Sequence, residues 1–115
     1  MEWLPLKAIE DWQHLLQMSE LSPVVVFKHS TRCSLSSLAR QRLVDYDWPV
    51  STRIWWVDVI EQRELSRHIA AETQVHHESP QVLLIEKGIC FWDEDHLDIQ
   101  PEEIHAALRT SGASC

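Results

Sequence analysis

One of the three cysteines, Cys33, lies in the segment "FKHSTRCSLSSLAR", just after a run of valines. Ser36 follows three residues later, where a dithiol redox site would have its second cysteine. Cysteine attacks disulfides only as the thiolate, and a free cysteine is only about 3% thiolate at pH 7. The first question is therefore whether the fold activates Cys33 or buries it as an inert thiol.

The position of Cys33 along the chain favours activation. The apolar run Val24–Phe27 predicts a buried strand, and the pattern from about Cys33 to Val44 predicts a helix. Cys33 then begins that helix, where backbone N–H groups lack partners and the positive end of the helix dipole lies. Both features stabilise a thiolate, so we predict that Cys33 is a nucleophile.

Polar residues of the segment "KHSTR" surround this cysteine in the sequence. Lys28, His29 and Arg32 either add positive charge near Cys33 or bind a carboxylate of a small thiol, and the alternative is a solvated loop. Thr31 contributes a hydroxyl to the same predicted pocket. We predict these four residues as substrate-binding residues.

Ser36 lies one helical turn after the cysteine, on the same face. Its hydroxyl either donates a hydrogen bond to the thiolate or is an ordinary helix serine. It cannot attack a mixed disulfide, so an outside thiol must release the product. We therefore predict a catalytic pair, Cys33 and Ser36, that exchanges with a small-molecule thiol.

The dipeptide Ser79–Pro80 precedes a second apolar run, "QVLLI". An X-Pro bond here is a candidate cis peptide. Beside a reactive cysteine it would present the backbone of Ser79 as an edge for an extended substrate. Ser79 and Pro80 therefore complete the predicted substrate-binding set.

The other acids, cysteines and histidines that could take part in chemistry are predicted to have structural roles. Asp58 ends a predicted strand as a boundary or capping residue, and a buried acid for proton transfer is the alternative. Cys90 falls in a strand and is predicted to be core, whereas Cys115 could reach Cys33 only if the chain end folds back. Three histidines lack the spacing of a zinc motif, so we predict no metal site: His76, His77 and His96.

Composition limits the classes of partner. The 115 residues suit one domain, with 44% hydrophobic and 24% charged residues and a net charge of -8. An acidic chain argues against nucleic acid and anionic membrane as partners. No apolar stretch is long enough to span a bilayer, and the first residues lack a signal-peptide pattern. The cysteine count is low and odd, which argues against a fold held together by disulfides. We therefore expect a cytoplasmic protein.

The predicted elements alternate between helices and strands. Helical periodicity begins near Leu6, "RIWWVDV" predicts a second strand, a short helix runs from about Ile60 to Ala71, a hairpin turns at Lys87-Gly88, and Pro101 begins a last helix. This order predicts an α/β fold of thioredoxin-like type. Its sheet is a mixed four-stranded one, parallel strands plus a C-terminal antiparallel hairpin, with helices on both faces. The domain is expected over residues 1–110, with a flexible tail at 111–115.

Two stretches, "VVVFKHSTRCSLS" and "HESPQVLLIEKGICFW", resemble the YtxJ-like bacillithiol-system redox proteins, the monothiol bacilliredoxins. The likeness covers nearly the whole chain, and the "KHST" plus CxxS combination carries it. Ser34 departs from the pattern, since many relatives have proline there. The resemblance implies that Cys33 removes bacillithiol, or a similar low-molecular-weight thiol, from S-thiolated client proteins. It implies a co-substrate thiol and no permanently bound cofactor.

Two other functions suit the same residues. Monothiol glutaredoxins also have CxxS and an upstream lysine, and they share a [2Fe–2S] cluster across a dimer, but this chain lacks their glycine next to the cysteine. A thioredoxin-fold adaptor with an inert Cys33 is the third hypothesis. The reactivity of Cys33 against pH separates an adaptor from an exchanger, and visible absorption bands identify a cluster.

Overall fold

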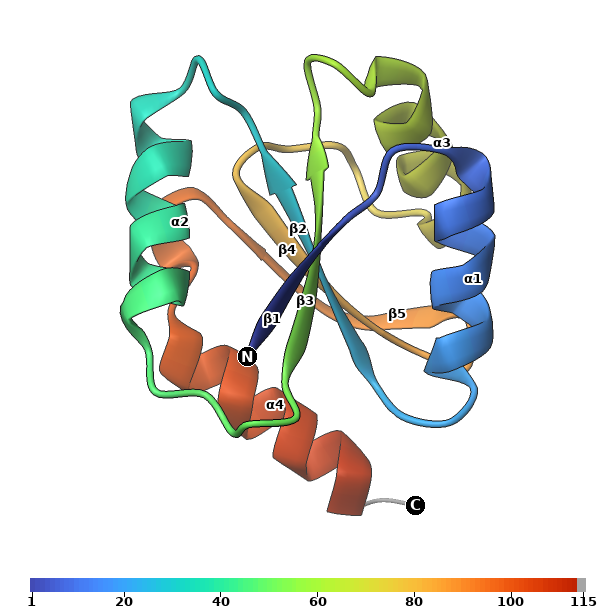
Figure 1. Ribbon diagram of the computed structural model, residues 1–115, viewed down its shortest axis with the longest axis vertical. Helices are drawn as coiled ribbons and strands as arrows, with labels where there is room; N and C mark the ends of the chain where they lie inside the picture. Colours follow the sequence, from blue (N-terminus) through green and yellow to red (C-terminus); the bar gives the residue numbers. More distant parts are fainter. Residues whose placement is uncertain (114–115) are drawn as a thin grey trace.

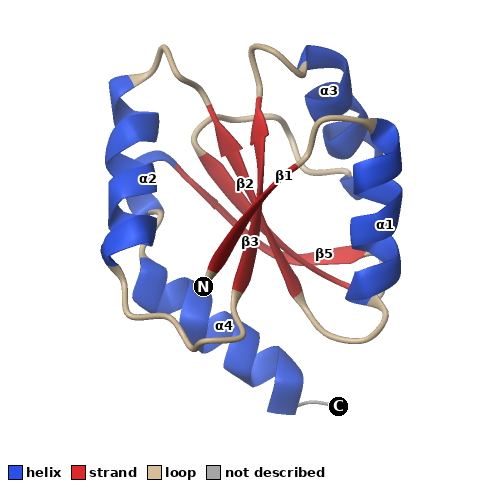
Figure 2. Ribbon diagram, in the orientation of Figure 1, coloured by secondary structure: helices blue, strands red, loops and turns tan. Residues whose placement is uncertain are grey.

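The computed structural model describes the backbone of residues 1–113 and the side chains of residues 1–110. Five strands and four α-helices lie within these residues and alternate as far as β4; β5 follows β4 directly, and one 3₁₀ turn precedes the last helix (Figure 2). Their bounds are β1 Glu2–Pro5, α1 Ile9–Ser19, β2 Val24–His29, α2 Ser34–Asp45, β3 Arg53–Asp58, α3 Arg63–Thr73, β4 Gln81–Glu86, β5 Ile89–Asp95, η1 His96–Asp98 and α4 Pro101–Ala113.

The sheet has the strand order β1-β3-β2-β4-β5. Strands β1, β3 and β2 are parallel, whereas β4 runs antiparallel to β2 and β5 antiparallel to β4. The α/β class and the mixed sheet with its antiparallel hairpin are therefore confirmed. The turn of the hairpin has Lys87 and Gly88 at φ 52° and 76°, the positive values that a two-residue turn between twisted strands requires.

The sheet contains five strands, so the predicted number of four is wrong. The missed strand β1 is only four residues long and ends in Pro5, and it lies at the edge of the sheet beside β3. Proline is tolerated at the end of an edge strand. The pairing that defines this strand joins Glu2 to Arg53, far along the chain, so the local pattern gave no strand signal.

Two hydrophobic clusters hold the helices against the sheet. One face packs against α1 and α3 through Trp12, Leu15, Leu65 and Ile69. The opposite face packs against α2 and α4 through Ala39, Leu43 and Ile104. Figure 1 shows these two helix pairs on opposite sides of the sheet. The prediction of helices on both faces is confirmed. Because the helices cover both faces of the sheet, the ends of the strands are the part of the sheet that they leave uncovered.

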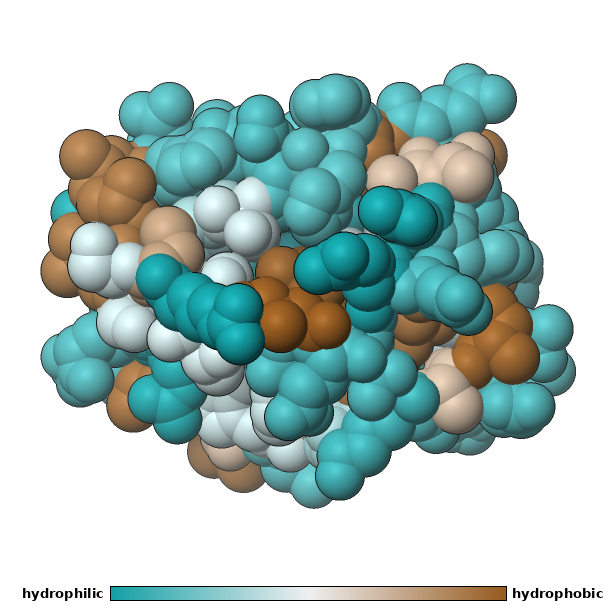
Figure 3. All heavy atoms as spheres, turned by 90° about the horizontal axis from the view of Figure 1, so that it is seen from above, coloured by the Kyte–Doolittle hydropathy of each residue, from teal (hydrophilic) through white to brown (hydrophobic). Residues whose placement is uncertain are grey.

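Three connections meet at one end of the sheet. The parallel strands β2 and β3 end there and lead into α2 and α3 (Figure 1). Because β4 is antiparallel to β2, its first residue, Gln81, pairs with Lys28 near this same end. The carboxyl ends of parallel strands are where α/β folds bind ligands. Seen from this end, the surface is mainly hydrophilic with a small hydrophobic patch near its middle (Figure 3).

Several element boundaries differ from the predicted ones. Strand β2 runs on to His29, so the polar loop before Cys33 is shorter than "KHSTR". Helix α3 begins at Arg63 rather than near Ile60. Helix α4 includes residues 111–113 of the predicted tail, and residues 114–115 lie outside the described residues. Over the part of the chain that is described, no helix is both long and apolar enough to cross a membrane.

Candidate functional site

Cys33 is the N-cap residue of α2, with an extended backbone at φ -114° and ψ 120°. Its carbonyl oxygen accepts the N–H groups of Ser36 and Ser37 at 3.1 and 3.2 Å, and its own N–H donates to Ser30 O at 3.3 Å. The side chain is half-buried and forms no cap hydrogen bond. The prediction that Cys33 stands at the start of a helix is confirmed, and its thiol is free.

Ser36 is completely buried under the loop that precedes the cysteine. Its Oγ accepts the N–H of Ser30 at 2.9 Å and lies 2.7 Å from Nδ1 of His29. The two contacts join the first turn of α2 to the end of β2. Ser36 therefore braces the loop that holds Cys33, and its predicted hydrogen bond to the thiolate stays a prediction.

A Ser36→Ala variant is expected to lose about 1–3 kcal/mol of stability, because the N–H of Ser30 is then buried without an acceptor. Urea denaturation against the wild type measures this loss. Ser37→Ala is the matched control, since Ser37 is exposed on the same turn. Equal stability of the two variants would show that the brace contributes nothing.

His29 connects this brace to the neighbouring charges. Burial is the main cause that lowers its pKa, the Arg40 guanidinium lowers it further, and the Asp58 carboxylate opposes the shift. The ring also packs on Phe27, with centroids 5.6 Å apart. At neutral pH the lowered pKa keeps His29 uncharged, so it supplies a hydrogen-bonding ring rather than the predicted positive charge.

Lys28 lies on the other face of the sheet from His29, because adjacent strand residues point to opposite sides. It belongs to β2 and is fully buried, so it is not a residue of the polar loop. The sequence gave no sign of this, since a lysine after a hydrophobic run normally marks the end of a buried strand. The side chain reaches toward α3 and the segment that precedes Pro80.

The Lys28 ammonium group has two polar contacts. Nζ donates to Ser66 O at 3.3 Å and lies 3.2 Å from Nδ1 of His77. Among the described residues no carboxylate lies within salt-bridge distance of it. Burial lowers the pKa of Lys28 to about 8, and burial together with the Lys28 charge lowers the pKa of His77. The pair links the end of β2 to the connection between α3 and β4.

The peptide bond between Ser79 and Pro80 is cis, as the sequence suggested. Pro80 is buried, and its carbonyl accepts the N–H of His96 at 3.0 Å. The register that pairs Lys28 with Gln81 places Pro80 at the end of β2, on the β4 side. Arg32 is exposed in the loop, and its backbone N–H donates to Ser30 Oγ at 3.4 Å.

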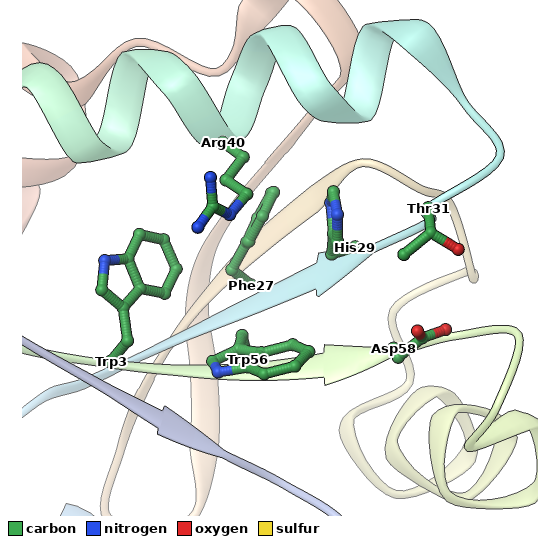
Figure 4. A pocket seen from close by; sticks show the side chains of 7 residues that line it. All are labelled: Trp3, Phe27, His29, Thr31, Arg40, Trp56 and Asp58. Atoms are coloured by element: carbon green, nitrogen blue, oxygen red, sulfur yellow. The ribbon is translucent and has the colours of Figure 1, made fainter.

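A cavity of about 420 Å³ opens between α2 and the β1–β3–β2 side of the sheet. We call it the aromatic pocket, and Figure 4 shows its lining residues: Trp3, Phe27, His29, Thr31, Arg40, Trp56 and Asp58. Arg40 points from α2 toward Trp3, whereas Thr31 and Asp58 lie at the opposite end, nearest the loop to Cys33 (Figure 4). Two predicted binding residues, His29 and Thr31, thus meet in one cavity.

Most of this pocket was not predicted from the sequence. Arg40 stands seven residues after Cys33, a spacing of two helical turns that could have indicated a shared face. Trp3 gave no such signal, because it reaches the pocket only through the pairing of β1 with β3. Asp58 caps the turn before α3, since its Oδ1 accepts the N–H groups of Ile60 and Glu61 at 2.9 and 3.1 Å.

The second described cysteine is unsuited to attack. Cys90 donates its S–H to Trp92 O at 3.3 Å, packs against the α1–α3 cluster, and has its pKa raised mainly by burial. It remains a thiol at neutral pH, which fits the predicted core role. Cys115 lies outside the described residues. Within residues 1–110, no three side chains of His, Cys, Asp or Glu are grouped so that they could hold a metal ion.

The mixed sheet with helices on both faces, the free thiol at the N-terminus of α2 and the cis proline before β4 are features of the thioredoxin class of folds, and solved structures agree. A candidate oxidoreductase with a thioredoxin fold is similar, with 28% identity, coverage of 91% of this chain and 92% of that chain, and a TM-score of 0.81. Malassezia sympodialis thioredoxin (Mala s 13) matches at 14% identity, 96% and 90% coverage and TM-score 0.72. Chlamydomonas reinhardtii thioredoxin f2 is similar with 19% identity, coverage of 95% of each chain and a TM-score of 0.72.

The particular family follows from the sequence. The model of the family "Monothiol bacilliredoxin BrxC" matches residues 4–104, which is most of the chain. The protein therefore belongs to the monothiol bacilliredoxin family, and the predicted resemblance to that family is confirmed. Family and fold together give the chain a role in thiol redox chemistry.

Proposed function

We propose that this protein removes bacillithiol, or a similar low-molecular-weight thiol, from mixed disulfides with client proteins. The observation that carries the proposal is the half-buried thiol of Cys33 at the N-cap of α2, with a buried serine one turn later. The thiol is accessible to a disulfide, because the Cys33 side chain is only half-buried and forms no cap hydrogen bond. The reducing cytoplasm is the compartment that suits such a free thiol.

The reaction is one exchange followed by another. The Cys33 thiolate attacks the sulfur of the small thiol, a new disulfide forms between them, and the old disulfide breaks. The client cysteine leaves as a thiolate and takes a proton from water. Ser36 has no sulfur with which to displace the small thiol, so a second small thiol must attack the product and regenerate Cys33.

Transfer of the small thiol is the direct test. The reduced protein is mixed with a client that has bacillithiol on one cysteine, and intact masses are followed with time. The expected result is loss of the bacillithiol mass from the client and its gain on this protein, at Cys33 by peptide mapping. Release without any gain of mass on Cys33 contradicts the proposal.

A further inference from the structure

We propose that the aromatic pocket binds the body of the small thiol, a ring-sized group whose far end has a carboxylate that pairs with Arg40. This inference rests on the proposed exchange reaction and adds the chemical class of its substrate. It also assigns a binding role to residues that the sequence did not indicate. The occupant is the low-molecular-weight thiol itself, in the disulfide that Cys33 attacks or forms.

The size and lining of the pocket suit such a group. A volume of about 420 Å³ lies within the usual range of small-molecule sites, which is about 300–1,000 Å³. Trp56 and Phe27 form an aromatic wall from two adjacent strands (Figure 4). Flat aromatic faces pack on sugar or other rings and provide large contact area with little loss of side-chain freedom.

The charges are arranged along the length of the pocket. Arg40 lies at the end far from the loop, with its Cζ 5.9 Å from the centroid of the Trp3 ring, and no salt bridge is found for it in the described part of the chain. A guanidinium group on an aromatic face keeps its N–H donors available for a carboxylate. Asp58 stands at the opposite end (Figure 4), where it would favour a positive group of the ligand.

The spacing from Cys33 matches a ligand of this size. Arg40 comes seven residues after the N-cap, which is about 10 Å along the helix axis at 1.5 Å per residue. Thr31, at the near end of the pocket, is two residues before Cys33. A small thiol bonded to Cys33 could therefore extend along the pocket, with its far carboxylate beside the Arg40 guanidinium.

The pocket and the cis proline lie on opposite sides of β2. The pocket spans β1, β3 and β2, whereas Pro80 lies immediately before β4. A client chain placed along Ser79 would therefore leave the pocket free for the small thiol. Holding the body of the small thiol also selects its sulfur, rather than the client sulfur, for attack by Cys33.

The test compares two mixed disulfides of one client, one with bacillithiol and one with cysteamine, which has no carboxylate. Arg40→Gln is expected to raise KM for the bacillithiol disulfide about tenfold, as expected for loss of one charge-assisted contact. Its effect on the rate for the cysteamine disulfide should be much smaller than its effect on the bacillithiol disulfide, and Arg40→Lys should recover part of the loss. Arg109→Gln on α4 is the matched control for removing one positive charge.

Two readouts separate this inference from the proposed function. Alkylation of Cys33 by neutral iodoacetamide should proceed at the same rate in Arg40→Gln and wild type, which shows that the thiol itself is unaltered. If the wild type releases neither small thiol, the exchange function fails. If it releases both but Arg40→Gln affects them equally or not at all, the function stands and the pocket assignment is overturned.

Discussion

A Cys33→Ser variant is expected to leave the bacillithiol of a client protein in place, with release slowed by on the order of 100-fold or more. A serine hydroxyl is not ionised at neutral pH and cannot form a disulfide with the small thiol. Ser36 offers no replacement, because its Oγ is buried between Ser30 and His29. The measurement is the rate at which free client appears, followed by intact mass.

Cys90→Ser is the matched control for this loss. Cys90 is a half-buried, hydrogen-bonded thiol whose pKa is raised mainly by burial, so its replacement should leave the rate of release unchanged. The folded state of both variants is checked by urea denaturation. Wild-type rates in Cys33→Ser would remove Cys33 as the nucleophile, whereas a loss in Cys90→Ser alone would transfer that role to Cys90.

Replacement of Lys28 by methionine is expected to stabilise the protein by about 1–3 kcal/mol at pH 7. Methionine has a similar length and no charge, and Lys28 is fully buried. Lowering its pKa from 10.5 to about 8 corresponds to on the order of 3 kcal/mol, at about 1.4 kcal/mol per unit. Ser66 O and His77 lose a donor, which offsets part of this gain.

The pH dependence identifies the cause. Below about pH 8, Lys28 is protonated in both the folded and the unfolded chain, so the cost of burying its charge is fully present. Between about 8 and 10.5 only the unfolded chain keeps the proton, and the wild type gains stability as pH rises through this range. The advantage of Lys28→Met should therefore shrink between pH 8 and 10.5.

Urea denaturation at pH 7 and pH 9.5 tests both parts of this expectation. Lys7→Met is the control, since Lys7 is exposed before α1 and its replacement should change stability little at either pH. A Lys28→Met variant less stable than the wild type at both pH values would show that the polar contacts of Lys28 outweigh the cost of burying its charge.

Local patterns were sufficient to predict the frame of the site. The valine run before "KHSTRC" and the periodic apolar residues after Cys33 defined β2 and α2, so the N-cap position of Cys33 could be predicted. The polar residues and Pro80 before "QVLLI" likewise suggested the start of β4. These features depend on residues close together in the chain, where side-chain period and backbone preference act directly.

The sequence by itself therefore determined the class of fold and the position of Cys33 and Ser36 at the start of α2, and only the tertiary structure decided what surrounds them. Lys28 and His29 are neighbours in the chain, yet the alternation of β2 sends one to His77 on the α3 side and the other to Ser36. Trp3 joins the aromatic pocket because β1 pairs with β3, about fifty residues away. Pairings of this kind depend on how distant segments pack together, which no local pattern contains.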